Sequence, residues 1–133
     1  MTPEELRDVP LLQGVSDAGL ERIAAHGALL DASPGQVLAL PADPGSGMFV
    51  ILEGTVGVEV RGSAIELDAG TFFGELALLV PDAARVARVR AATACRLLSI
   101  PRDDLDALLD TEPRFARAML VEVARRLVRS TSA

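Results

Sequence analysis

The sequence predicts a mainly β domain with α-helices at both ends. From about Leu29 to Ile100, apolar runs of strand length alternate with turn-forming groups such as Ser33-Pro34-Gly35 and Asp68-Ala69-Gly70. Turns this closely spaced are typical of an all-β sandwich or barrel. On either side of this region the apolar residues instead recur with the period of an α-helix.

Two helical segments are expected before the β region. Thr2 to Arg7 has the pattern of a short helical turn. Ser16 is a good N-cap for a second helix that runs to about Ala25, with Leu20 and Ile23 facing inward.

Within the β region, alternation is clearest in two neighbouring segments. Each segment places its apolar residues on one face, and we expect the two to pair as a hairpin through Glu53-Gly54. The sets are Met48, Val50 and Leu52, followed by Val56, Val58 and Val60.

After Pro101 we expect a helix from Arg102 to about Asp110, a break at Glu112-Pro113 and a long helix from about Arg114 to Arg129. The apolar stripe of the long helix is wider than one ordinary core face. We therefore predict that one side packs on the β unit and another on a partner helix, as in a homodimer. A helix covered by its own domain is the alternative. The stripe comprises Phe115, Met119, Leu120, Val123, Leu127 and Val128, widened by Ala116, Ala118, Val121 and Ala124.

Composition excludes several classes of function. With 133 residues, a single domain is expected. The net charge of −6, with scattered arginines as the only basic residues, opposes nucleic-acid binding.

No apolar run reaches the roughly 18 residues of a membrane span, and the N-terminus has no export signal, so we expect no membrane contact and a cytoplasmic location. The lone Cys95 is expected in the core.

Catalytic and metal sites are not expected. His26 is the only histidine, so neither a multi-histidine metal site nor a histidine-dependent triad can form elsewhere in the chain. No carboxylate spacing favours acid-base catalysis. We predict a protein that is not an enzyme and that needs no metal or cofactor.

The segment with the most chemical information is Gly70 to Leu79, followed by Arg85. Gly74 lets the backbone approach a ligand, and N–H groups at the start of a short helix attract anions. Arg85 can present a planar fork to phosphate oxygens, and Glu75 can accept a hydrogen bond from a sugar hydroxyl. These residues fit a ribose phosphate, although a turn, a helix and a surface ion pair would give the same pattern.

This segment, Phe73-Gly74-Glu75-Leu76-Ala77-Leu78, resembles the phosphate-binding cassette of the cyclic-nucleotide-binding domain family. The resemblance runs from Pro10-Leu11-Leu12 to Ala124-Arg125-Arg126-Leu127 and is greatest to the sensor half of the catabolite activator (Crp-Fnr) branch, without its helix-turn-helix domain. It implies a β jelly roll, or double-stranded β-helix, with a long C-terminal helix. The implied parts of the single domain 1–133 are helices over 1–28, a jelly roll over 29–100 with the cassette at 72–88, and helices over 101–133.

The resemblance also implies a ligand, cAMP or cGMP, and assigns residues to it. Glu75 would bind the ribose 2′-hydroxyl, and Arg85 the cyclic phosphate. Backbone groups of the cassette would line the site, and two hydroxyl residues of the last helix would contact the purine. The implied ligand-binding residues are Phe73, Gly74, Glu75, Leu76, Ala77, Arg85, Val86, Ala87, Ser130 and Thr131.

Two positions depart from the family pattern. Val86 replaces the usual serine or alanine, removes a hydroxyl and crowds the site. Arg88 stands where members that prefer cGMP often carry threonine, which favours cAMP. Two functions therefore remain open: a cyclic-nucleotide sensor that acts on a separate protein partner, and a nucleotide-independent scaffold or dimerisation module.

Overall fold

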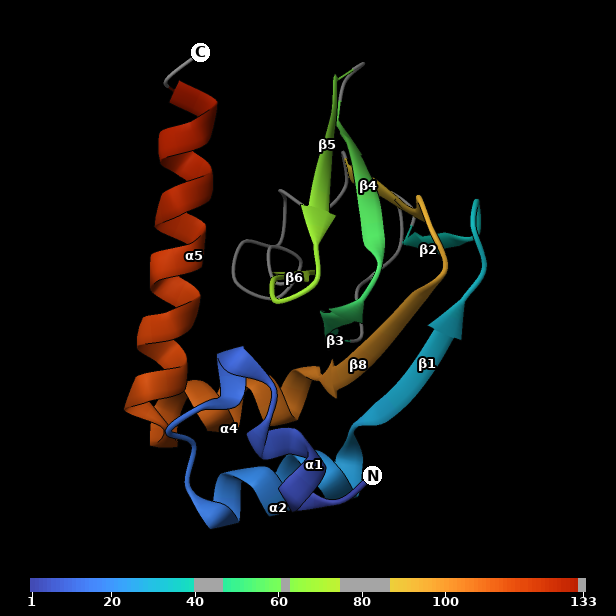
Figure 1. Cartoon of the computed structure of the whole chain (residues 1–133). Coiled ribbons are helices and arrows are strands. Elements are labelled where there is room, and N and C mark those ends of the chain that lie inside the picture. The colour runs from blue at the N-terminus through green and yellow to red at the C-terminus, as the bar shows by residue number, and fades with distance from the viewer. Residues whose placement is uncertain (40–46, 61–62, 75–86, 132–133) are drawn as a thin grey trace.

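The computed structural model describes residues 1–39, 47–60, 63–74 and 87–131. Helices at the two ends of the chain gather beneath and beside a β unit (Figure 1). No helix in these ranges is both long and apolar enough to cross a membrane. The described helices are α1 (Pro3–Arg7), the 3-10 turn η1 (Pro10–Leu12), α2 (Asp17–His26), α4 (Arg102–Thr111) and α5 (Pro113–Thr131).

The strands form two antiparallel sheets. Sheet A has the order β1-β8-β3-β6, and sheet B has the order β2-β7-β4-β5. The two sheets form the expected β jelly roll, and the helices flank it. The strands are β1 (Ala28–Ala32), β2 (Val37–Ala39), β3 (Gly47–Glu53), β4 (Thr55–Val60), β5 (Ser63–Asp68), β6 (Phe72–Phe73), β7 (Ala87–Ala91) and β8 (Cys95–Pro101).

Sheet A is the middle layer of three, with the helices on one face and sheet B on the other. Alternating side chains of its strands therefore enter two different cores. In β8, for example, Leu98 and Ile100 pack with the helices, whereas Cys95 and Leu97 pack against sheet B. Cys95 is 5% exposed, which confirms its expected place in the core.

The predicted hairpin between the segments around Val50 and Val58 is wrong. β3 pairs with β6 and β8, whereas β4 pairs with β5 and β7, so the chain changes sheets at Glu53-Gly54. Gly54 makes this crossing with φ +91°, and a Cβ there would collide with the carbonyl oxygen of Ala94. Beyond Gly54, the backbone N–H of Thr55 donates to Thr93 Oγ1 at 3.0 Å, which fixes the start of β4.

The helices at the two ends of the chain are joined at the start of α2. Ser16 is the N-cap of α2, as expected, and its hydroxyl accepts from the N–H of Gly19. Glu112, at the junction of α4 and α5, accepts from both the backbone N–H and the hydroxyl of Ser16, each at 2.7 Å. His26, at the other end of α2, bonds Asp104 Oδ1 through Nδ1 at 2.7 Å. Polar bonds thus hold both ends of α2 to the C-terminal helices.

The long helix α5 has one packed side and one exposed apolar side. Phe115 and Met119 are buried against the other helices and sheet A. Four apolar residues face the opposite way and remain exposed: Leu120 (68%), Val121 (41%), Leu127 (65%) and Val128 (62%). Packing on the protein's own β unit therefore uses only part of the apolar stripe.

Candidate functional site

The described part of the predicted cassette begins at β6, at the edge of sheet A. Its two phenylalanines point to opposite faces: Phe72 packs in the core shared with the helices, and Phe73 in the core between the sheets. Phe73 is 3% exposed and stacks on Phe49, with ring centroids 5.1 Å apart. Both faces of β6 thus anchor the segment that leads to Glu75.

Gly74 follows with a conformation and a neighbourhood that favour glycine. Its φ is +90°, in the region that L side chains avoid. A Cβ at this position would lie 3.0 Å from the carbonyl oxygen of Gly47 and 3.4 Å from Cα of Met48. The backbone of β6 therefore turns directly against β3 at the residue that precedes Glu75.

The structure describes some of the other predicted site residues and leaves others undescribed. Ala87 begins β7, opposite Val60 of sheet B, so the two described ends of the cassette belong to different sheets. Ser130 and Thr131 lie in the last turn of α5, and their side chains are not described. The remaining five candidates fall outside the described residues: Glu75, Leu76, Ala77, Arg85 and Val86.

Arg88 lies on the outer face of sheet B. Val89 points into the core between the sheets, and adjacent residues of a strand point to opposite faces. Arg88 therefore points away from that core. The preference for cAMP that its identity favours stays a prediction, because residues 75–86 of the cassette lie outside the described residues.

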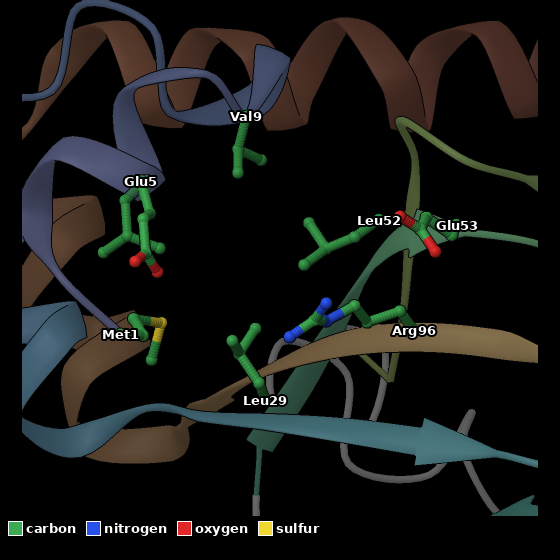
Figure 2. Close-up of a pocket in the computed structure, with 8 residues that line it drawn as sticks. Met1, Glu5, Val9, Leu29, Leu52, Glu53 and Arg96 are labelled. Carbon is green, nitrogen blue, oxygen red and sulfur yellow. The ribbon is translucent and has the colours of Figure 1, made fainter.

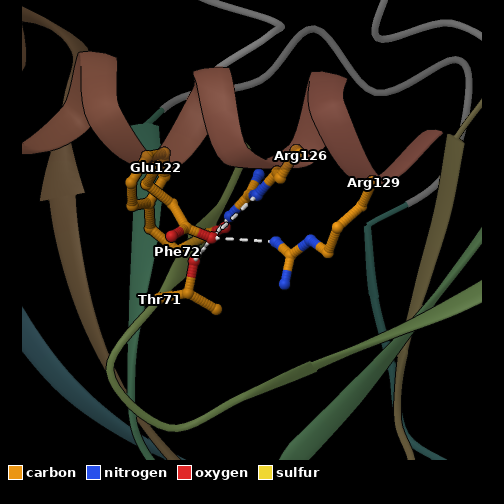
Figure 3. Close-up of polar contacts among 5 residues, drawn as sticks. All are labelled: Thr71, Phe72, Glu122, Arg126 and Arg129. Atoms are coloured by element: carbon orange, nitrogen blue, oxygen red, sulfur yellow. Dashed lines mark hydrogen bonds and ion pairs between the residues drawn. The ribbon is translucent and has the colours of Figure 1, made fainter. Parts of the chain in front are cut away.

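A polar network links α5 to the start of the cassette, at Thr71 and Phe72 (Figure 3). One terminal nitrogen of Arg126 donates to the carbonyl oxygen of Phe72 and, at 2.7 Å, to Thr71 Oγ1. Glu122 Oε1 accepts from the hydroxyl of Thr71 at 2.9 Å and from Arg126 Nε and Arg129 Nη2, each at 3.4 Å. The guanidinium of Arg126 also lies 4.7 Å from the centre of the Phe72 ring.

The sequence interpretation gave this network no role. In the sequence, Arg126 belongs to the run Ala124-Arg125-Arg126-Leu127 that resembles the family, and its pairing with Glu122 is a common i,i+4 contact on a helix surface. In the structure both side chains are only 19% exposed and reach β6. A charged pair within an otherwise apolar helix face was the signal that could have identified it.

The described residues contain no cluster of three or more acidic, cysteine or histidine side chains that could hold a metal ion. His26 is bonded to Asp104, which is also 3.3 Å from Arg22 Nε. His26 therefore takes part in a polar contact between α2 and α4 and is not one of the residues of the cassette.

Residues 29–112 match the model of the cyclic nucleotide-binding domain. Among curated relatives, a cyclic nucleotide-gated potassium channel of Rhizobium etli is 37% identical over 111 residues, which is 84% of this chain and 31% of the channel. The chain thus spans less than a third of that relative.

Solved structures of cyclic-nucleotide proteins are also similar to this chain. A cAMP-binding acyltransferase from Mycobacterium smegmatis superposes with a TM-score of 0.82 and 29% identity, over 96% of this chain and 41% of the acyltransferase. A structure from work on a cyclic-GMP-dependent signalling pathway in bacterial phytopathogenesis has a TM-score of 0.66 and 29% identity, over 86% of this chain and 95% of that one. With the matching domain model, the jelly roll and the cassette motif, this chain belongs to the cyclic nucleotide-binding domain family.

Proposed function

We propose that this chain binds a purine cyclic nucleotide through the segment 72–88 and acts as a regulatory module on a separate partner, without catalysing a reaction itself. The observation that carries the proposal is the turn at Gly74. It brings the backbone of β6 against β3 at the residue where the family motif begins its ligand contacts. The two sheets hold the described ends of the segment on either side.

The residue roles follow the family motif. Arg85 binds the cyclic phosphate as a bidentate donor, and Glu75 accepts from the ribose 2′-hydroxyl. Gly74, Leu76 and Ala77 supply backbone groups. Phe73 supports the segment from the core between the sheets, where it stacks on Phe49. The remaining positions at the ligand are Val86, Ala87, Ser130 and Thr131.

The network around Arg126 supports a regulatory role. The same helix that ends with Ser130 and Thr131 is bonded to Thr71, immediately before the cassette, and to Phe72, its first residue. A ligand that changes the position of residues 72–88 would bias this contact and hence the position of α5. The output is therefore a population shift of α5 that a partner protein detects.

We propose cAMP as the preferred ligand over cGMP. The support is the similarity to the cAMP-binding acyltransferase, which superposes more closely than the structure from the cyclic-GMP pathway. Both are 29% identical to this chain, so direct measurement must compare the two nucleotides.

The test is calorimetric titration of nucleotide-free protein with cAMP and, separately, with cGMP. We expect saturable binding of one nucleotide per chain, weakened about 10- to 150-fold in Arg85→Ala by the loss of charge-assisted phosphate bonds. Arg117→Ala, an exposed arginine of α5, is the matched control and should bind normally. Folded protein that binds neither nucleotide up to millimolar concentration would overturn the sensor function and favour the nucleotide-independent scaffold.

The exposed side of α5 supports a homodimer. Leu120, Val121, Leu127 and Val128 recur at helical spacing and, with exposed Ala124, form one stripe opposite the packed side. A twofold axis would place this stripe against the same stripe of a second copy. Light scattering should show a dimer at tens of micromolar that Leu120→Glu with Leu127→Glu converts to monomer, whereas Arg125→Glu retains it. A monomeric wild-type protein would contradict this assignment.

A further inference from the structure

A cavity of about 380 Å³ lies between α1 and the helix-facing side of sheet A (Figure 2). Its walls come from α1 and the residues around it, from β1, from the end of β3 and from β8. β6, which leads into the cassette, lies beyond β3 at the edge of the sheet. None of the described residues that line the cavity belongs to the segment 72–88, and the cavity volume falls in the lower part of the range for small-molecule pockets, roughly 300–1,000 Å³.

The middle of the cavity is apolar. Val9 points into it from the N-terminal helices, and Leu29 and Leu52 point into it from the sheet (Figure 2). All three belong to, or pack against, the core between the helices and sheet A. A ligand with a hydrocarbon body would therefore contact a continuous apolar lining.

Arg96 places a cation at the sheet wall. It is on the face of β8 that also carries Leu98 and Ile100, so a charged residue extends a row of core residues. Asp31 and Glu53 are its neighbours across the two adjacent strands. Cross-strand opposite charges often pair, yet no ion pair joins Arg96 to either carboxylate in the described part of the chain. Its guanidinium instead points into the cavity (Figure 2), and Glu53 lines the cavity beside it.

Glu5 places a carboxylate at the opposite wall. Its exposed side chain extends from α1 beside Met1, across the apolar lining from Arg96 (Figure 2). Neither side chain is paired with the other among the described residues. The cavity is therefore apolar in the middle, with the Arg96 guanidinium beside Glu53 at the sheet wall and the Glu5 carboxylate at the helix wall.

We propose that this cavity binds a small zwitterion whose two charged groups are separated by an apolar body. A carboxylate of the ligand would accept from the Arg96 guanidinium, which favours planar two-oxygen acceptors. An ammonium group at the other end would lie beside Glu5, and the hydrocarbon between them would pack on Val9, Leu29 and Leu52. A ligand with only one of these charges would pair with either Arg96 or Glu5 and would leave the other side chain without a partner of opposite charge.

The experiment is an NMR titration of the ¹⁵N-labelled chain, beginning at Met1, with 8-aminooctanoate, octanoate and octylamine. Since the zwitterion has about 11 non-hydrogen atoms, we expect a dissociation constant on the order of 1 mM. The amides of Leu29, Leu52 and Arg96 should shift. The zwitterion should bind more tightly than either singly charged probe. Equal affinity for all three, or no saturable shift up to about 20 mM, would overturn the proposal.

Two variants separate the charged walls. Arg96→Met should weaken the binding of 8-aminooctanoate and octanoate by about 2- to 5-fold, because the side chain is exposed and solvent screens its charge, and should leave the binding of octylamine unchanged. Glu5→Gln should weaken 8-aminooctanoate and octylamine by about 2- to 5-fold and spare octanoate. Arg117→Met is the control and should bind all three probes as the wild type does.

An Arg96→Met variant that binds octanoate as tightly as the wild type would show only an apolar cavity and refute the assignment. Arg96→Lys keeps the charge and provides the comparison if the methionine variant does not fold. Titration of the same samples with cAMP tests the nucleotide site independently, so failure at one site is distinguishable from failure at the other.

Discussion

Replacing Arg126 with methionine should destabilise the protein by about 2–4 kcal/mol. The change removes the bonds to the Phe72 carbonyl, Thr71 Oγ1 and Glu122, and the contact of the guanidinium with the Phe72 ring. Charge-assisted hydrogen bonds contribute about 1.5–3 kcal/mol, and a cation–π contact about 0.5–1 kcal/mol. Solvent screening is weak, because the side chains of Arg126 and Glu122 are each 19% exposed.

The assay is urea unfolding followed by circular dichroism, at one protein concentration because dimerisation would make stability concentration-dependent. Arg125→Met is the matched control: Arg125 is the exposed neighbour on the same helix, and its loss should change the free energy of unfolding by less than about 0.5 kcal/mol. The free energy of unfolding of Arg126→Lys should lie between those of the two methionine variants, because lysine keeps the positive charge but lacks the planar guanidinium that donates several hydrogen bonds. Equal stability of the Arg125→Met and Arg126→Met variants would refute the assigned role of the network.

Three further substitutions test the fold. Gly54→Ala should lower the melting temperature far more than Gly35→Ala: both glycines have positive φ, which costs about 1–2 kcal/mol for alanine, but only Gly54 also lacks room for a Cβ. Phe115→Ala should cost about 3–5 kcal/mol in chemical denaturation and Leu120→Ala in the same helix less than about 0.5 kcal/mol in the monomer, since only Phe115 is buried. Glu112→Gln should cost about 1–3 kcal/mol, because the caps at the start of α2 lose their charged acceptor. An unchanged midpoint for Glu112→Gln would contradict that account.

The helices could be predicted from local signals. Thr2 and Ser16 are hydroxyl N-caps, and each accepts a backbone N–H bond in the structure. Pro113 separates α4 from α5 because proline is tolerated in the first turn of a helix and disfavoured within it. Such signals depend on residues near one another in the sequence, so no tertiary contact is needed to find them.

The pairing of strands β3 and β4 could not be predicted in this way. Glu53-Gly54 between two alternating segments has the pattern of a short hairpin turn. The alternation of Val50 with Phe49 and Ile51 does not reveal that both faces of β3 are covered, one by helices and one by sheet B. Which sheet a strand joins depends on partners such as β8, which are remote in sequence.

For the candidate site, the motif identified the segment but not its surroundings. The sequence predicts that Gly74 lets the backbone approach a ligand, which stays a prediction, whereas the close approach of Gly74 to Gly47 of β3 is seen only in the structure. The contact of Arg126 with Thr71 and the position of Arg96 at a cavity both depend on how α5 and α1 lie on sheet A. Side-chain identity alone carries no information about that placement.

The bonds between Ser16 and Glu112 have a consequence for biosynthesis. The two residues are separated by 96 positions, so during translation α2 begins without its partner and obtains it only when the last quarter of the chain appears. Because chains are synthesised from the N-terminus, we expect the helical layer to become stable after the strands of both sheets have been made. Hydrogen exchange on a chain truncated after Pro101 would test this order: the α2 amides should exchange rapidly there and slowly in the full chain. Protected α2 amides in the truncated chain would show that the helix matures independently of its distant carboxylate.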